Sequence, residues 1–412
     1  MSRFQFRHKL PTPARQIQLR PYQQECIDTC LSTLAKGTRR QMLSLPVASG
    51  KTVIAAHLIP QIPPPLRGAT KTLFLAHRDE LWDQAYNRIN SAGLGLKVTM
   101  DQGKLTPDMD ADVIVASVQS LGGAGSKRLQ KYNPKEFKCI LVDEAHHAVT
   151  DTYLRIFGHF GVGAADSHIA LVGLSATVKR EDDIKLGSVF DVIPFHQSVE
   201  SMIAEGWLCR LLVKTIRIDT GQSLQNFKMG LNDFQRKDLS QKINTPERNK
   251  IIVQGYIDNC ANRMSTIAFA TDIAHVEALT RAFQQHGLDA RAVSSKTPNA
   301  ERKQLVNDFR ERKFPILVNC GILTEGTDIP TIDSILMARP TKSEILLQQM
   351  LGRGMRLYEG KKNCLVLDFA DIVDGNYLGV QPTLLGLDPK QVLTGESHSW
   401  ECKLFLKREA NL

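Results

Sequence analysis

One short stretch of the chain carries the residue types that bind phosphate. The apolar run 42–45 predicts a strand and residues 53–59 predict a helix. The loop between them ends in four residues that suit phosphate binding: Ser49, Gly50, Lys51 and Thr52. Backbone N–H groups at a helix start bind anions, Lys51 can reach the terminal phosphates, and Thr52 can hold Mg²⁺. Leu45 stands where the motif G-x-x-x-x-G-K-[ST] has its first glycine, so this stretch alone leaves the nucleotide site open.

Two adjacent carboxylates end another apolar run. Asp143 and Glu144 follow residues 139–142, which predict a buried strand. A carboxylate at the carboxyl end of a parallel strand lies where α/β folds bind ligands. Asp143 is placed to hold Mg²⁺, directly or through water, and Glu144 to orient and deprotonate a water that attacks the γ-phosphate. Because this motif lies downstream of Lys51 in the same predicted lobe, the two together favour ATP hydrolysis.

The elements that must position these residues form a repeating α/β pattern. After a helix at 21–36 and the phosphate loop, further strands are predicted at 72–76, 112–117, 139–142 and 169–174. Continuous Val, Ile and Leu runs between helices indicate a parallel sheet covered on both faces. We therefore expect a basic arm or transit peptide at 1–18 and a first α/β lobe at 19–205.

The same pattern returns after a polar connection, predicted at 206–245. Strands are predicted at 266–270, 290–293, 316–319, 334–338 and 364–368. Helices are predicted at 272–286, 299–311 and 343–355. We expect a second α/β lobe at 246–375 and a short tail at 376–412.

Composition narrows the class of protein. The sequence contains no run of about 20 apolar residues, so it predicts no membrane-spanning helix. The net charge of +9 suits a polyanionic partner such as nucleic acid, although a solvated basic surface would give the same charge. The eight cysteines form neither a C-x-x-C pair nor a zinc-type cluster, which favours a reducing compartment without disulfides or a structural metal. The first 24 residues contain no Asp or Glu, which is typical either of a mitochondrial transit peptide or of a disordered basic arm.

Taken in order, these motifs resemble the motor of superfamily 2 helicases over residues 19–371. The resemblance implies two tandem RecA-like P-loop lobes that bind ATP and Mg²⁺. Residues 19–24 resemble the adenine-reading segment, which gives that role to Gln23. Residues 72–80, 116–121 and 173–177 resemble motifs Ia, Ib and III. The resemblance implies nucleic-acid contacts in the first lobe by Arg78 and Ser120. It implies coupling roles for three further residues: His146, Ser175 and Thr177.

In the second lobe, residues 267–272, 319–330 and 349–356 resemble motifs IV, V and VI. The resemblance implies nucleic-acid contacts by Thr271 and Thr324. It places two residues of motif V at the nucleotide: Gly326 and Asp328. Motif VI reads Q-x-x-G-R-x-x-R and supplies three residues to the catalytic site: Gln349, Arg353 and Arg356.

On the predicted helix 343–355, the motif VI residues at i, i+4 and i+7 share one face. That face is expected to look across a cleft at the Lys51 loop, which makes Arg353 and Arg356 candidate arginine fingers. The resemblance also has His146 meeting Gln349 there. A solvated basic helix end would explain the two arginines but not the accompanying Gln349 and Gly352.

Four other residues are expected to have ordinary roles. His57, His77 and His147 are expected at core or surface positions, and Trp82 in ordinary packing. Ala48, where many relatives have glycine, is expected to tighten the phosphate loop.

Several motifs together, including residues 244–249, resemble one branch of the superfamily. It contains restriction-enzyme motor subunits, excision-repair helicases and fungal mitochondrial branch-migration helicases, and the last look most similar. Such fungal relatives continue beyond motif VI, so an accessory C-terminal DNA-binding region is expected to be absent or reduced. The leading hypothesis is a monomeric, mitochondrial, ATP-dependent helicase or translocase on duplex or branched DNA. An RNA helicase, a nucleic-acid-binding scaffold with little motor activity, and a nuclear or cytoplasmic location stay open.

Overall fold

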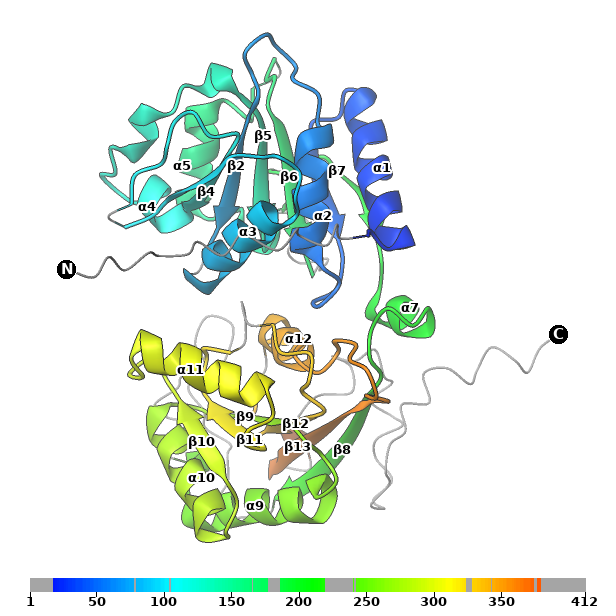
Figure 1. Cartoon of the computed structure of the whole chain (residues 1–412), viewed down its shortest axis with the longest axis vertical. Helices are drawn as coiled ribbons and strands as arrows, with labels where there is room; N and C mark the ends of the chain where they lie inside the picture. Colours follow the sequence, from blue (N-terminus) through cyan, green and yellow to red (C-terminus); the bar gives the residue numbers. More distant parts are fainter. Residues whose placement is uncertain are drawn as a thin grey trace, which may run out of the picture. The chain divides into compact units, whose positions relative to one another are not determined.

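The computed structural model describes residues 18–77, 79–103, 105–164, 166–176, 186–218, 240, 242–323, 328–341, 343–373 and 376–378. Loop residues Val47–Ser49 aside, the chain divides into two compact units, one ending at Gln197 and the other beginning at Ser198. Each unit is built on its own sheet with helices around it (Figure 1). The two-lobed α/β fold predicted from the sequence is therefore confirmed.

The first sheet has seven strands in the order β3-β4-β2-β5-β6-β1-β7, and every pairing among them is parallel. The strands are β1 (Arg40–Ser44), β2 (Lys71–Ala76), β3 (Val98–Asp101), β4 (Val113–Ser117), β5 (Phe137–Asp143), β6 (Ala170–Ser175) and β7 (Val192–His196). Parallel pairing brings all carboxyl ends to one edge of the sheet. In particular, Ser44 pairs with Ser175, and Leu174 pairs with Asp143.

Helices cover both faces of this sheet. They are α1 (Pro21–Ala35), α2 (Lys51–Leu58), α3 (Asp79–Ser91), α4 (Val118–Gly122) and α5 (Asp151–Phe160). Alternate strand residues such as Leu73 and Leu75 share one core cluster with Ile156 and Phe157 of α5. Helices α1, α2 and α3 pack side by side as a second group. Burial on both faces explains why β4 and β5 are continuous apolar runs.

The second sheet follows the order β10-β11-β9-β12-β13-β14, and β8 pairs with β13. Its strands are β8 (Leu211–Ile218), β9 (Thr266–Phe269), β10 (Ala290–Val293), β11 (Ile316–Asn319), β12 (Ser334–Met337), β13 (Cys364–Val373) and β14 (Asn376–Leu378). The helices of this unit are α7 (Val199–Ala204), α9 (Pro246–Cys260), α10 (Ile273–Gln285), α11 (Asn299–Arg310) and α12 (Glu344–Leu351). Only the pairing of β13 with β14 is antiparallel among these described strands.

One strand lies where the sequence predicted a connection. Leu211–Ile218, within the predicted connection 206–245, forms β8 and pairs in parallel with β13 over its whole length. Charged Lys214 and Arg217 interrupt its apolar pattern, and its partner strand lies far away in the sequence. The local signal was therefore too weak to separate this strand from a polar linker.

The start of α9 shows how the segment 244–249 acts in the fold. The Thr245 hydroxyl accepts a hydrogen bond from the Arg248 N–H and caps the helix. The Arg248 side chain is 1% exposed and donates to the Phe369 carbonyl at 3.0 Å. The Asn249 amide donates to Asn244. This segment therefore fastens α9 to β13, the strand that contains Phe369.

A buried histidine packs against this segment. His275 Nδ1 accepts a hydrogen bond from the Thr271 N–H at 3.2 Å, and its Nε2 lies 3.2 Å from Asn249 Oδ1. Burial, and after it the positive charge of Arg248, lower the pKa of His275 from 6.5 to about 4. The fold therefore accommodates the neutral imidazole and disfavours its protonated form.

Replacing His275 by Gln is expected to reduce the acid sensitivity of the fold. The pKa of His275 is lower in the folded than in the unfolded chain. Its contribution to the free energy of unfolding is therefore complete above pH 6.5 and is lost as the pH falls towards about 4. Linkage gives a loss on the order of 2 kcal/mol between pH 7 and pH 5 in the native protein. Urea unfolding of wild type and variant at both pH values measures it. His286→Gln, an exposed histidine after the same helix, is the control; equal pH dependence in all three proteins would contradict the assignment.

Candidate active site

The phosphate loop joins β1 to α2 through two residues with positive φ. Ala48 has a φ of 66° and Gly50 a φ of 82°. A Cβ on Gly50 would lie 2.7 Å from Nε2 of Gln23, so the glutamine amide lies directly against the loop. Gln23 is 5% exposed, and its Oε1 accepts a hydrogen bond from the Arg20 N–H at 3.0 Å. The structure thus brings the predicted adenine reader and the phosphate loop together within the first lobe.

Substitutions at Ala48 and Gly50 are expected to act in opposite directions. The left-handed region costs a residue with a Cβ roughly 1–2 kcal/mol. Ala48→Gly removes that cost. Glycine also makes the unfolded chain more flexible, which offsets part of the gain, so the free energy of unfolding should rise by about 0.5 kcal/mol or more. Gly50→Ala adds the same cost and displaces Gln23, so both stability and the affinity for ATP should fall. Thermal unfolding and the KM for ATP measure both variants; destabilisation by Ala48→Gly would contradict the strain assigned to this loop.

Glu144 lies next to Lys51 at the carboxyl edge of the sheet. Lys51 Nζ is 3.9 Å from Glu144 Oε1 and donates to the Leu45 carbonyl at 3.5 Å. Both side chains are nearly buried, with 9% and 11% of their surface exposed. Glu144 has a φ of 50°, and its N–H donates to Asp143 Oδ1 at 3.1 Å. A left-handed conformation at a residue other than glycine is strained, and such strain concentrates at functional positions.

The donor set fits a nucleotide with Mg²⁺. Thr52, in the first turn of α2, and Asp143, at the end of β5, offer the hydroxyl and carboxylate oxygens that Mg²⁺ prefers. A Cβ at Gly50 would collide with the Gln23 amide, so glycine lets the two lie together, and the N-terminus of α2 offers backbone N–H groups to an anion. The first lobe therefore supplies both the oxygen ligands for Mg²⁺ and the N–H donors for the phosphates.

The segment 143–146, Asp-Glu-Ala-His, also places a histidine next to Glu144. His146 Nδ1 lies 3.4 Å from Glu144 Oε2 and 3.5 Å from the Ser175 hydroxyl at the end of β6. Two of the predicted coupling residues, His146 and Ser175, are thus in contact with each other. Thr177, the third, lies outside the described residues.

His77 and His147 are part of the same arrangement, which the sequence did not indicate. The His147 ring stacks on His77 with centroids 4.8 Å apart and lies 4.1 Å from the His146 ring. The Gln119 amide donates to the His77 carbonyl at 2.7 Å and lies 3.1 Å from its Nδ1. Trp82, by contrast, has the predicted packing role: it is 5% exposed and donates to the Ala76 carbonyl.

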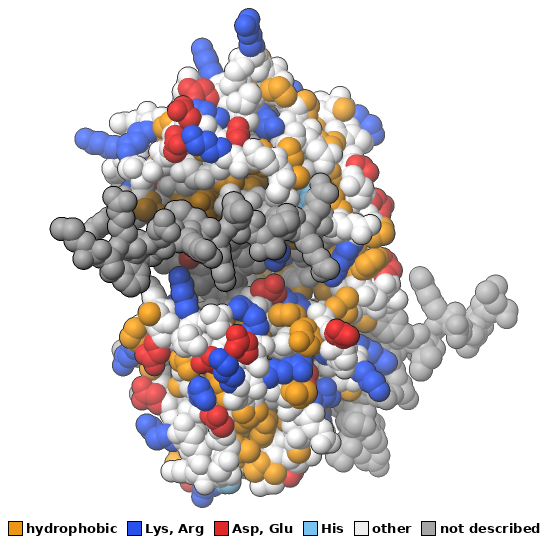
Figure 2. Space-filling model, in the orientation of Figure 1, with side chains coloured by type: hydrophobic (Ala, Val, Ile, Leu, Met, Phe, Trp, Pro, Cys, Tyr) orange, Lys and Arg blue, Asp and Glu red, His pale blue; other side chains and the backbone are white. Residues whose placement is uncertain are grey.

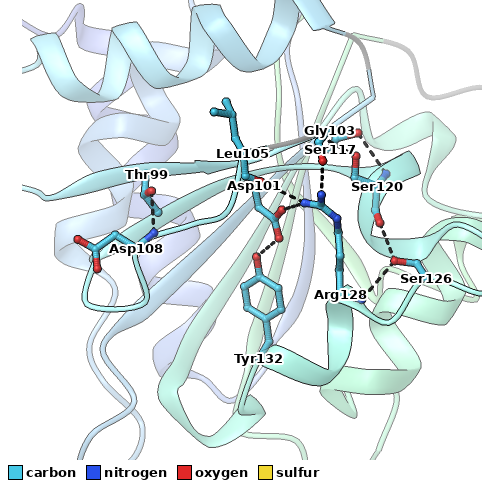
Figure 3. Close-up of polar contacts among 10 residues, drawn as sticks. All are labelled: Thr99, Asp101, Gly103, Leu105, Asp108, Ser117, Ser120, Ser126, Arg128 and Tyr132. Atoms are coloured by element: carbon cyan, nitrogen blue, oxygen red, sulfur yellow. Dashed lines mark hydrogen bonds and ion pairs between the residues drawn. The ribbon is translucent and has the colours of Figure 1, made fainter.

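Ser120, a predicted nucleic-acid contact, belongs to a polar cluster around Arg128 (Figure 3). Its hydroxyl accepts from the Gly103 N–H at 3.4 Å, and its carbonyl accepts from the Ser126 hydroxyl at 2.7 Å. Arg128 binds the Asp101 carboxylate and the Gly103 carbonyl. These bonds fasten the loop after β3 to the segment that follows β4.

Tyr132 completes this cluster from below in Figure 3 and donates to Asp101, which is 1% exposed. Burial, and then the hydrogen bond to Asp101, raise the pKa of Tyr132 far above its usual range. The phenol therefore stays protonated and remains a donor to the buried carboxylate. The contacts of this cluster hold the segment that contains Gln119 and Ser120 in place.

Motifs V and VI meet within the second lobe. Arg356 Nε lies 2.9 Å from Asp328 Oδ1. Gln349 and Arg353 are 5% and 7% exposed, and Arg353 Nε lies 3.4 Å from the Gln349 carbonyl. The four described residues that the sequence assigned to catalysis or nucleotide binding in this lobe thus form two contacting pairs, Asp328 with Arg356 and Gln349 with Arg353.

The helix that carries motif VI ends earlier than predicted. α12 ends at Leu351 rather than at 355, with Gly352 as its C-cap, so Arg353 and Arg356 lie beyond the helix. The prediction that the motif shares one helical face through i+7 was therefore wrong. After Leu351 the chain continues in tighter turns, in which the Arg353 N–H donates to the Met350 carbonyl and the Gly354 N–H to the Leu351 carbonyl. A Cβ on Gly354 would lie 2.4 Å from Cys364 Sγ, so the chain packs closely there.

Lys361 holds the segment that replaces the last helical turn. Its Nζ donates to the carbonyls of Gly354 and Arg356 at 2.8 Å each. Burial lowers the pKa of Lys361, although the carbonyl oxygens that accept its hydrogen bonds favour the charged ammonium. The backbone from Gly354 to Arg356 is thus held by a lysine that the pattern of motif VI does not include.

Other predicted contacts are not brought into this group. The Thr271 side chain is 2% exposed and bonds with His275, so its predicted nucleic-acid contact stays a prediction. Arg78, Thr324 and Gly326 lie outside the described residues. Figure 2 shows basic side chains interspersed with acidic ones on the face in view, rather than gathered into one patch. Among the described residues, no helix is both long and apolar enough to cross a bilayer.

Two family descriptions match the two lobes. "Type III restriction enzyme, res subunit" matches residues 16–180, and "Helicase conserved C-terminal domain" matches residues 247–358. The first match contains the Lys51 loop and Glu144, and the second contains Arg353 and Arg356.

Relatives match across both lobes. The chain is 40% identical over 378 residues to "Putative ATP-dependent helicase IRC3" of Saccharomyces cerevisiae, covering 90% of this chain and 54% of that protein. It is 40% identical over 376 residues to "Putative mitochondrial ATP-dependent helicase irc3" of Schizosaccharomyces pombe, covering 91% and 61%. The chain thus spans little more than half of the length of these relatives. A fragment of a putative HsdR subunit of a type I restriction enzyme from Vibrio vulnificus shares the fold, with a TM-score of 0.67, 20% identity and coverage of 92% and 68%.

Proposed function

Because the chain belongs to the superfamily 2 helicases, we propose that it is an ATP-driven motor that unwinds or remodels duplex and branched DNA. The observation that carries this proposal is the group at the carboxyl edge of the first sheet, where Lys51 and His146 flank Glu144. A cation and a histidine on either side of a nearly buried carboxylate suit a general base for phosphoryl transfer better than a purely structural role.

Each residue of the first lobe has a distinct task in this proposal. Lys51 and the α2 N–H groups bind the β- and γ-phosphates, and Gln23 reads the adenine. Glu144 orients the attacking water and accepts its proton, while His146 holds the carboxylate in place. Thr52 and Asp143 would hold Mg²⁺, which supplies positive charge to the phosphate oxygens when it is bound.

The second lobe contributes charge for the transition state in the same proposal. Arg353 and Arg356 act as arginine fingers once ATP draws the lobes together, and Asp328 keeps Arg356 oriented until then. Hydrolysis then releases the lobes, and alternating grip on phosphates moves the chain along the nucleic acid. Contacts with the phosphate backbone make binding weakly sequence-specific and strongly dependent on salt.

DNA is the proposed partner, the mitochondrion the proposed location and a monomer the proposed working unit. The word "mitochondrial" in the name of the S. pombe relative and the acid-free N-terminus support the location. A reporter fused behind residues 1–18 tests it, and a cytosolic reporter would refute it. The net charge of +9 supports a nucleic-acid partner but does not distinguish DNA from RNA.

Comparing polynucleotides as activators tests the proposed substrate. ATP turnover is measured with branched DNA, linear duplex DNA and structured RNA of matched length, each over a range of salt. Branched or duplex DNA should stimulate most, with half-saturating concentrations that rise steeply with salt. Stimulation by RNA alone would replace the proposal by an RNA helicase, and binding without stimulation would favour a scaffold.

A further inference from the structure

We propose that a stack of three histidines, His77, His147 and His146, transmits nucleic-acid binding to the catalytic base Glu144. This inference rests on the proposed function and adds a route within the first lobe by which polynucleotide raises the rate of ATP hydrolysis. His77 and His147 act in it as positioning residues. The His147 N–H donates to the Glu144 carbonyl at 3.1 Å, and the proposed route from the two rings to the Glu144 carboxylate runs through His146.

The stack begins where two strands of the first sheet end. His77 directly follows β2, and Gln119 lies just after β4, the strand that pairs with β2. The Gln119 amide binds the His77 carbonyl at 2.7 Å and also lies 3.1 Å from Nδ1 of its ring. A shift of either segment therefore moves the His77 ring.

The middle of the stack joins segments far apart in the sequence. The rings of His77 and His147 lie 4.8 Å apart at an interplanar angle of 23°, which is a stacked arrangement. The His147 ring is 4.1 Å from that of His146 at an angle of 48°. Aromatic rings in contact favour a defined mutual orientation, so a shift of one ring is opposed by the next. Couplings between two sites of a protein are typically about 5- to 150-fold in the coupled equilibrium.

The stack ends on the reacting group. His146 Nδ1 lies 3.4 Å from Glu144 Oε2 and 3.5 Å from the Ser175 hydroxyl. The His146 side chain is 5% exposed, so it has little free space in which to move without changing its contact with Glu144. A shift of the His147 ring that displaces the His146 ring therefore changes the orientation of the Glu144 carboxylate towards the attacking water.

At the His77 end of the stack, hydrogen bonds and an ion pair hold the segment that carries Gln119, so a shift of this segment moves His77 instead of deforming the segment itself. Arg128 binds Asp101 and Gly103, and Ser126 binds Ser120, which fixes the segment that carries Gln119 (Figure 3). A polynucleotide that contacts this segment therefore shifts it as a unit.

Replacing His147 by Ala and by Phe tests the proposal in the full chain. The measured quantities are the ratio of ATP turnover with saturating duplex DNA to turnover without it, and the half-saturating DNA concentration. His147→Ala should lower the ratio by about 5-fold or more, since the stack is interrupted, and leave the half-saturating concentration unchanged. His147→Phe keeps an aromatic ring and should restore most of the ratio. His286→Ala, an exposed histidine of the second lobe, is the control and should match wild type.

His77→Ala and His77→Phe provide a second pair at the other end of the stack, in case His147→Ala does not fold. They should show the same loss and recovery of the ratio. A ratio equal to wild type in the folded alanine variants would overturn the proposal, and so would phenylalanine variants that fail as fully as alanine. If DNA stimulates ATP turnover in the wild type and the alanine variants keep the wild-type ratio, only the proposed role of the stack is refuted. If no nucleic acid stimulates turnover of the wild type, the proposed function is refuted, and the role of the stack with it.

Discussion

Glu144→Gln is expected to lower ATP turnover by about 10²–10⁴-fold, the usual contribution of a general base. The amide keeps the shape of the side chain, which is 11% exposed, but cannot accept a proton from water. The contact with Lys51 at 3.9 Å loses its charge, and the 3.4 Å contact with His146 Nδ1 weakens. ATP binding should remain measurable, because the phosphate loop and Gln23 are unchanged. Steady-state turnover with and without DNA, together with equilibrium binding of ATP, separates these effects.

Glu136→Gln is the matched control for this substitution. Glu136 lies in the same lobe, pairs with Lys71, and has 39% of its side chain exposed. Its replacement should leave turnover unchanged, because exposed ion pairs contribute little to stability or geometry. Turnover by Glu144→Gln near the wild-type rate would show that the catalytic base lies elsewhere.

Arg353→Ala and Arg356→Ala are expected to lower DNA-stimulated turnover by about 10³-fold or more, within the range for arginine fingers. The second lobe holds both residues ready, Arg356 on Asp328 at 2.9 Å and Arg353 beside the Gln349 carbonyl. Lysine at either position should recover little activity, because an ammonium lacks the planar fork of donors that matches a phosphate. Stimulated turnover and DNA binding are the quantities to measure.

Arg281→Ala provides the control for these variants, since Arg281 is exposed on α10 of the same lobe. Loss of turnover with DNA affinity retained is the expected pattern for Arg353→Ala and Arg356→Ala. Loss of DNA affinity with normal ATP turnover would instead assign both arginines to the nucleic-acid track.

Motifs that depend on local spacing were predictable. The strand–loop–helix context of Lys51 and the carboxylates that end β5 follow from apolar runs and from the order of elements in a parallel sheet. The register of Ser44 with Ser175 and of Asp143 with Leu174 then brings their strand ends together. Even the strain at Ala48 has a sequence signal, since alanine occupies a position where related loops have glycine.

Features that depend on distant partners were not predictable from the chain alone. β8 forms because β13 pairs with it, and the segment after α12 is held by Lys361, which donates to the Gly354 carbonyl. The histidine stack joins His77 to His147 through geometry that no spacing rule encodes. Single histidines have many roles, so only the folded arrangement distinguishes a stack from ordinary packing.

ATP turnover of the full wild-type chain beside Lys51→Ala, with and without duplex DNA at low salt, tests the central claim most directly. Lys51 is 9% exposed next to Glu144, where it would bind the terminal phosphates. We expect turnover that rises severalfold or more with DNA in the wild type and falls to background in Lys51→Ala, with both proteins folded alike. Equal, DNA-stimulated turnover by the two proteins would contradict a motor built on the Lys51 loop.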